Sequence, residues 1–120
     1  MKKETLRTNL LIHLFALAHG LVVVLFYQLG WTDEIALTCL TILMIMLVTR
    51  TYRFPLDLSA VMALLFCFAG FFMGTHGARL LRPLAESVSP VLANVICTVG
   101  ITEVIGWATW FIASRKRVEN

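Results

Sequence analysis

The sequence predicts an all-α integral membrane protein, a single domain over residues 1–120 in which four transmembrane helices form an up-and-down antiparallel bundle. Two observations predict this fold class. Of the 120 residues, 59% are hydrophobic and 14% are charged, whereas a soluble domain carries roughly a quarter charged residues and under half apolar ones. The apolar residues also gather in stretches close to the roughly 20 residues that a helix needs to cross a bilayer. Because a small water-soluble fold could not hide so much apolar surface, lipid is the expected solvent.

The predicted helices cover residues 10–29, 32–52, 55–76 and 90–113. The second apolar run is short, but Trp31 and Tyr52 flank it in the manner of the aromatic anchors found at membrane surfaces. The third run reaches a spanning length when its ends, Pro55 and His76, are included. The chain therefore has enough apolar length for four crossings and little left over for another domain.

Residues that favour helix starts precede the last three runs. Residues 32–34 supply an N-cap and acidic charge for the second helix. Pro55 opens the third helix, and Ser89 followed by Pro90 opens the fourth, because proline fits the first helical turn, where its missing N–H is not needed. Residues 78–86 are expected to form a short turn of helix lying on the surface. The connections are short, which favours antiparallel neighbours.

The basic residues lie mostly on one side of the predicted membrane. Arg79 and Arg82 fall on one side, and eight residues fall on the other: Lys2, Lys3, Arg7, Arg50, Arg53, Arg115, Lys116 and Arg117. The positive-inside rule then predicts a multi-pass protein of the inner (plasma) membrane with both termini cytoplasmic. The net charge of +3 reflects helix ends that face anionic headgroups, so no nucleic-acid partner is expected.

Small residues form stripes along the predicted helices. Gly70 and Gly74 make a GxxxG pattern that Gly77 extends, and Ala16 and Gly20 make a four-residue step on the first helix. Such stripes let helix backbones approach closely in lipid. Packing within the bundle is the favoured interpretation, and a homo-oligomer or a membrane partner protein is the alternative. Further candidates on the fourth helix are Ala93, Gly100 and Gly106.

Glu103 and His19 are ionisable residues near the middle of the fourth and first predicted spans. A carboxylate in hydrocarbon is costly, so Glu103 should be protonated, paired or facing a polar cavity. The first and fourth helices are neighbours in a closed four-helix bundle, and a hydrogen-bonded His19–Glu103 pair could then carry a proton. Alternatively, Glu103 is a neutral residue that locks the fourth helix to a neighbour. His19 by itself is more simply explained as a packing histidine.

Asn94, Thr98 and Thr102 follow one another at four-residue steps and therefore share one face of the fourth helix. They could line a wet path through the bundle. They could also hydrogen-bond to their own backbone and to neighbouring helices, as threonine commonly does in membranes. This structural interpretation is the favoured one.

Neither a metal nor another cofactor is expected. His13 and His76 lie at depths different from that of His19, so the sequence contains no evident pair of facing haem ligands. The cysteines, which form no C-x-x-C motif, are best explained as small packing residues. They are Cys39, Cys67 and Cys97.

The sequence carries no enzyme signature, and an enzyme is not expected. The favoured function is a small non-enzymatic membrane protein, a sensor, anchor or accessory subunit that acts through helix–helix contacts with a copy of itself or a partner. The alternative is a small oligomeric proton-coupled transporter or channel that uses Glu103 and His19.

Overall fold

The computed structural model describes residues 2–85 and 90–119. It consists of four α-helices: α1 (Lys2–Leu29), α2 (Glu34–Thr51), α3 (Leu56–Ala85) and α4 (Pro90–Glu119). No strand occurs within the described residues. Each helix is long and apolar enough to cross a membrane. The predicted all-α fold with four helices of spanning length is therefore confirmed.

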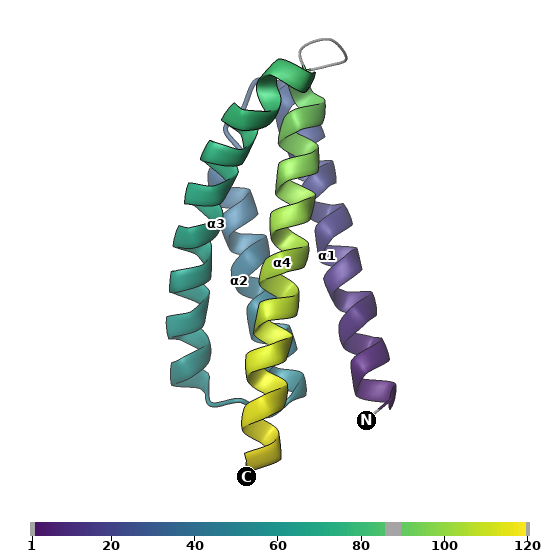
Figure 1. The fold of residues 1–120 in the computed structure, drawn as a ribbon, viewed down its shortest axis with the longest axis vertical. Coiled ribbons are helices and arrows are strands. Elements are labelled where there is room, and N and C mark those ends of the chain that lie inside the picture. Colours follow the sequence, from purple (N-terminus) through teal and green to yellow (C-terminus); the bar gives the residue numbers. More distant parts are fainter. Residues whose placement is uncertain (1, 86–89, 120) are drawn as a thin grey trace.

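The helices run alternately up and down (Figure 1). They form a ring in which each helix contacts the next along the chain and α4 returns beside α1. Contacts also join α2 to α4 across the ring, whereas α1 and α3 do not touch within the described ranges. Both termini lie at the same end of a body that measures 51 × 26 × 24 Å.

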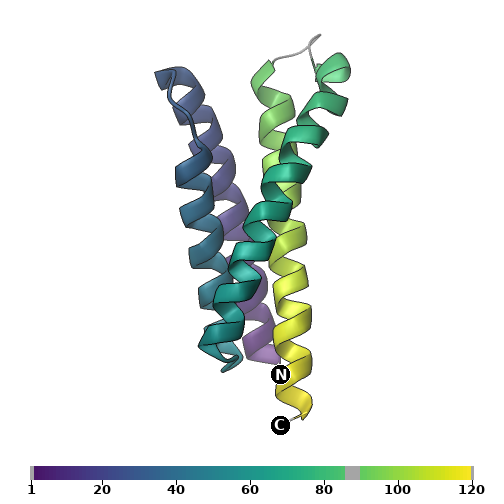
Figure 2. The same cartoon turned by 90° about the vertical axis from the view of Figure 1, so that its left-hand side faces the viewer.

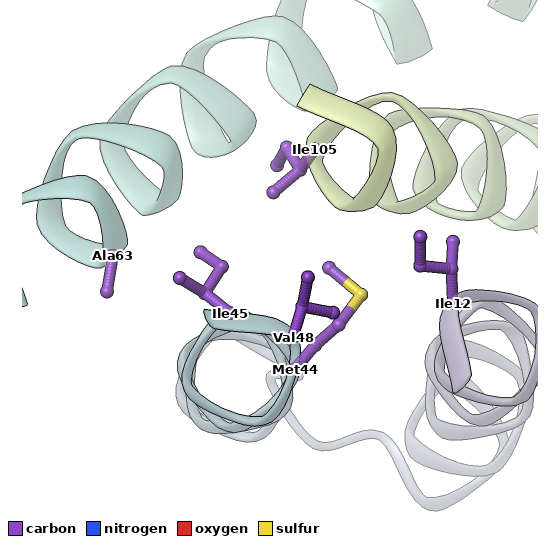
Figure 3. Packing of buried hydrophobic residues seen from close by; sticks show 6 residues of the cluster. All are labelled: Ile12, Met44, Ile45, Val48, Ala63 and Ile105. Carbon is purple, nitrogen blue, oxygen red and sulfur yellow. The ribbon is translucent and has the colours of Figure 1, made fainter. Parts of the chain in front are cut away.

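Apolar side chains from all four helices form one core nearer the end that holds the termini. Buried members of this core are Ile12, Met44, Ile45, Val48, Ala63 and Ile105 (Figure 3). Partly buried aromatic side chains, among them Phe15 and Trp110, pack against them. We call this part of the bundle the closed half. Beyond it, the α1–α2 pair and the α3–α4 pair diverge (Figure 2), and we call that part the open half.

Three helices are longer than the apolar runs that predicted them. α1 begins at Lys2 instead of residue 10, and α4 continues to Glu119 instead of ending at residue 113. α3 runs on to Ala85, so the turn expected over 78–86 mostly continues this helix, with Pro83 in its last turn. Hydropathy detects the part of a helix that crosses lipid, whereas good helix formers extend it beyond. Proline near a helix end removes a single backbone hydrogen bond.

α1 ends in a Schellman motif. The Gly30 N–H bonds the Tyr27 carbonyl at 3.2 Å, and the Trp31 N–H bonds the Phe26 carbonyl at 2.9 Å. Gly30 takes the left-handed conformation that this motif requires, with φ of 72°. The rings of Phe26 and Trp31 pack edge to face, with centroids 5.8 Å apart. The motif fixes the direction in which the chain leaves α1 toward α2.

α2 ends in the same motif with arginine in the glycine position. Arg53 has φ of 54°, its N–H bonds the Arg50 carbonyl at 3.1 Å, and the Phe54 N–H bonds the Thr49 carbonyl at 3.0 Å. At the other end of α2, Asp33 is the N-cap residue, but its side chain makes no capping hydrogen bond. The cap predicted at Ser89 lies outside the described residues.

Small residues bring α4 close to α1 and α3. A Cβ added to Gly70 would lie 3.0 Å from Cδ1 of Ile105, and one added to Gly20 would lie 3.1 Å from Cγ2 of Val99. The other members of the predicted stripes are also packed inside the bundle: Gly74 and Gly77 against α4, and Ala16, which is buried. In this structure the stripes face other helices of the same bundle.

Candidate functional site

The open half contains a cavity of about 280 Å³ that is partly open at the surface. Its wall is drawn from all four helices, with a single residue, His19, from α1. The cavity extends from this buried histidine to Asp33 and Glu34 at the beginning of α2, where Glu34 is exposed. No lysine or arginine lines the cavity among the described residues. Hydroxyl, amide and carboxyl groups border this cavity together with apolar side chains, and a concave site with such a mixed lining is a candidate site for a ligand.

The polar ladder of α4 lies on the wall of this cavity. Asn94, Thr98 and Thr102 all line it. Thr102 is 3% exposed, and its hydroxyl donates to the Thr98 carbonyl at 2.7 Å. The ladder thus borders the cavity, and Thr102 also bonds to its own helix. Sequence alone could not separate these two interpretations, since both require the same four-residue spacing.

His19 lies in the α1 side of the cavity wall and is held by two hydrogen-bond partners. Its side chain is buried, with 2% of the residue exposed. Nδ1 lies 2.6 Å from the Phe15 carbonyl oxygen, and Nε2 lies 3.0 Å from Oγ1 of Thr41 on α2. Oγ1 of Thr41 is also 2.9 Å from the Leu37 carbonyl oxygen. His19 therefore joins α1 to α2 instead of reaching toward α4.

These partners couple the protonation of His19 to the orientation of one hydroxyl group. A carbonyl oxygen can only accept, so Nδ1 of His19 carries a hydrogen. When the ring is neutral, Nε2 accepts the Thr41 hydroxyl hydrogen. When the ring is protonated, Nε2–H donates to Thr41 Oγ1, and the hydroxyl hydrogen turns to the Leu37 carbonyl. Adding one proton to His19 thus redirects the Thr41 hydroxyl at the cavity wall.

Glu103 bonds to a different histidine from the one expected. Its Oε1 lies 2.6 Å from Nδ1 of His13, and its Oε2 accepts from Nε1–H of Trp107 at 3.1 Å. The predicted His19–Glu103 pair is therefore wrong, because the histidine that contacts Glu103 is His13. The expectation that α1 and α4 are neighbours with a polar contact between them is confirmed.

The register between α1 and α4 explains this difference. Gly106 packs on Ile12 and Gly20 packs on Val99, so His19 lies level with Val99, about one helical turn from Glu103. His13 and His19 are also six residues apart, which places them on different faces of α1. The sequence placed Glu103 and His19 near the middle of two apolar runs, and the ends of these runs are not the ends of the helices.

His13 is the site residue that sequence reasoning missed. It lies at the α1–α4 boundary, where its ring packs edge to face with Trp107 at a centroid distance of 6.4 Å. The side chains of His13 and Glu103 are 53% and 25% exposed, so the pair faces outward and not into the cavity. The sequence carried one signal for the other partner of Glu103. Glu103 and Trp107 are four residues apart and therefore share a helix face.

The closed half has a polar contact of its own around Tyr52, which follows α2. Its hydroxyl oxygen accepts hydrogen bonds from Nε1 of Trp110 at 2.9 Å and from Oγ1 of Thr8 at 3.4 Å. Tyr52 is buried, with 6% exposed. It was expected to anchor the second helix at the membrane surface, and it instead ties α1, the end of α2 and α4 together inside the protein.

Metal-binding groups do not gather in this site. Within the described residues, no group of three or more histidine, cysteine or acidic side chains could hold a metal ion. The three thiols are free, and two of them, Cys67 and Cys97, line the cavity. The chain matches no family model, no curated protein and no solved structure.

Proposed function

We propose that this chain is a small multi-pass membrane transporter that binds a polar solute in the cavity of the open half. The observation that carries the proposal is the asymmetry of the bundle. One half is filled by the apolar core, and the other holds a cavity of about 280 Å³ bordered by hydroxyl, amide and carboxyl groups. A transporter that faces one side of the membrane needs this combination of an accessible site and a closed opposite half.

We place the protein in the plasma membrane, with both termini in the cytoplasm. The termini and the α2–α3 connection lie at the end of the closed half (Figure 1). Most basic residues belong to those segments, and positive charge favours the cytoplasmic side. The cavity would then open to the outside.

Coupling to protons is assigned to His19 and not to a pair with Glu103. His19 lines the cavity and its protonation redirects the Thr41 hydroxyl. Glu103 lies outside the cavity lining, bonded to His13 and Trp107. Its role is to hold α4 against α1, because a carboxylate that accepts two hydrogen bonds at a helix boundary is costly to separate from its donors.

Access to the cavity can be tested with the chain's own cysteines. Cys97 lines the cavity, whereas Cys39 is exposed and does not. A protein that keeps Cys97 alone, with serine at 39 and 67, is treated with a charged, membrane-impermeant methanethiosulfonate. The reagent is applied to intact cells and, separately, to inverted membrane vesicles. A transporter must expose Cys97 to each side in turn, so modification from both sides is expected.

Modification from the outside alone would overturn transport and leave a static binding site. Adding Thr98→Phe should slow modification of Cys97, because this side chain would fill the cavity. The matched control is Val104→Phe, which lies on the outer surface of α4 and should leave the rate unchanged. A protein that keeps Cys39 alone should resist the reagent from either side because its thiol would face lipid.

The outer face of α1 favours a second candidate function. In this alternative the chain is a membrane sensor, anchor or accessory subunit that acts through helix contacts. Its exposed leucines recur at spacings of a helical seam and flank the half-exposed His13: Leu10, Leu14, Leu17 and Leu21. A second copy could cover this face. Leu17→Cys should then form a disulfide-linked dimer in native membranes, whereas Leu64→Cys on the outer face of α3 should not. A monomer in both cases would contradict this candidate.

A further inference from the structure

We propose that the cavity binds a small primary ammonium ion and that protonation of His19 opposes this binding. The inference rests on the solute-binding role proposed above and names the chemical class of the solute. Three features carry it: the hydrogen-bond acceptors on the cavity wall, the sign of the charge at its mouth and the position of His19.

Several hydroxyl groups on the cavity wall have already used their hydrogens within the protein and can only accept. The hydroxyl of Thr75 donates to the Phe71 carbonyl at 2.9 Å, and the hydroxyl of Thr102 donates to the Thr98 carbonyl at 2.7 Å. Each oxygen keeps its lone pairs but has no hydrogen left for a ligand. The hydrogen of Thr41 is likewise taken by the Leu37 carbonyl or by His19. This wall favours a ligand that is rich in donors.

The mouth of the cavity adds negative charge. Asp33 and Glu34 line it, and carboxylates are acceptors that attract cations. No basic side chain lines the described part of the wall to compensate them. A primary ammonium group is positively charged and has three donors and no acceptor, which matches both properties of the cavity.

The remaining wall limits the size and shape of the ion. Phe66, Phe71 and Ile105 supply an apolar surface beside the polar groups. Aromatic rings tolerate a nearby cation and pack against a short alkyl chain. A volume of about 280 Å³ lies just below the range typical of drug-sized ligands, which begins at roughly 300 Å³. An amine with a short alkyl chain therefore fits better than a bulky one.

His19 gives this site a dependence on pH. The other titratable groups on the described wall are Asp33 and Glu34 of α2, Cys67 of α3 and Cys97 of α4. Protonated His19 places a positive charge in the buried part of the cavity wall, and two like charges repel strongly where water is scarce. A proton on His19 and an ammonium ion in the cavity therefore disfavour each other, which is the relationship that proton-for-cation exchange requires.

The experiment uses the full chain in lipid nanodiscs with ¹⁵N-labelled histidine. Ethylammonium chloride is titrated while the His19 ring signals are followed, with His13 and His76 assigned through their glutamine variants. A saturable shift of the His19 signals is expected near pH 8. Tetramethylammonium, which has charge but no N–H donors, and ethanol, which has no charge, should each bind at least about tenfold more weakly. No saturable shift with ethylammonium, or equal binding of either control, would overturn the proposal.

Variants locate the site and the proton. Thr98→Val should weaken ethylammonium binding, measured by calorimetry, by about tenfold, whereas Thr109→Val, on the same helix but away from the cavity, should leave it unchanged. Lowering the pH from about 8 to about 5 should weaken ethylammonium binding to the unmodified chain, because protonated His19 is then more populated. The same change should have no effect on His19→Gln, and a persistent pH effect in that variant would overturn the role of His19.

These outcomes are separate from those of the transport test. If Cys97 is modified from both sides but ethylammonium does not bind, the proposed transport is supported and the proposed ammonium ligand is wrong. If ethylammonium binds but Cys97 is reached from one side alone, the cavity has the proposed specificity without transport.

Discussion

Glu103 illustrates how far single residues could be predicted from the sequence. An ionisable residue in an apolar run must find polar partners, and that reasoning correctly required partners for Glu103. Choosing between His13 and His19 required the register of α1 against α4, which is set by contacts such as Gly106 on Ile12. Hydropathy carries no information about such contacts between helices.

The two hydrogen bonds of Glu103 lead to a prediction about stability. In Glu103→Gln, the amide oxygen can still accept from Trp107, and the amide N–H can donate to a neutral His13, so the unfolding midpoint in detergent should change little. Glu103→Leu leaves both partners without an acceptor and should lower the free energy of unfolding by about 1–3 kcal/mol. Val104→Leu, on the neighbouring outer position, is the control. A leucine variant as stable as the unmodified protein would show that these bonds contribute nothing.

Helices were predicted more completely than their ends and contacts. The four apolar runs predicted the number and order of the helices, because a run of about twenty apolar residues is long enough to cross a bilayer and is rare in soluble domains. The start of α1 and the ends of α3 and α4 were missed, since polar and basic helix formers carry these helices beyond their apolar parts. The small-residue stripes indicated close packing, but not that α4 is the helix on which Gly20, Gly70 and Gly77 pack.

The tightest of these contacts predicts a difference between two glycines of α4. A Cβ on Gly106 would lie 2.8 Å from Cγ2 of Ile12, which is fully buried and has no room to move. Gly106→Ala should therefore separate α1 from α4 and lower the free energy of unfolding by about 1–3 kcal/mol. A Cβ on Gly100 meets nothing within 4 Å, so Gly100→Ala should cost nothing. Equal effects of the two substitutions on thermal unfolding would contradict this packing.

The end of α2 predicts a gain in stability. Arg53 occupies a left-handed conformation, with φ of 54°, which costs roughly 1–2 kcal/mol for a residue with a side chain. Arg53→Gly should relieve much of this strain and raise the denaturation midpoint. Arg50→Gly places glycine inside the last turn of the same helix and should lower it. If both variants lose stability alike, the positive charge at the end of α2 contributes more to stability than the relief of backbone strain.

At the scale of the whole molecule, the ring of antiparallel helices followed from short connections, but the cavity did not. A cavity arises because the α1–α2 and α3–α4 pairs diverge beyond the core (Figure 2), and divergence depends on side-chain volumes summed over many contacts. The ladder of Asn94, Thr98 and Thr102 marked the wall in advance. Which side of the bundle remained open could not be inferred from it.

Tyr52 allows the closed half to be tested. Tyr52→Phe removes the oxygen that accepts from Trp110 and Thr8, and the lost bonds should loosen α1, α2 and α4 at this end. Modification of Cys97 in inverted vesicles should then become several-fold faster, with little change from the outside. Tyr27→Phe, which alters an exposed tyrosine of α1, should change neither rate. A slower or unchanged rate from inside would mean that Tyr52 does not keep this half shut.

The shortness of α2 has a consequence for the surrounding membrane. Its 18 residues span about 27 Å, while the hydrocarbon core of a bilayer is roughly 30 Å thick. Asp33 and Glu34 stand at one end of α2 and Arg50 at the other. In the proposed membrane setting, lipids would draw inward to keep these charges in water. A dimple in the bilayer would therefore lie beside the cavity mouth and shorten the path of a solute to His19. Short-chain lipids should stabilise the protein more than long-chain lipids, as thermal unfolding in defined bilayers would measure.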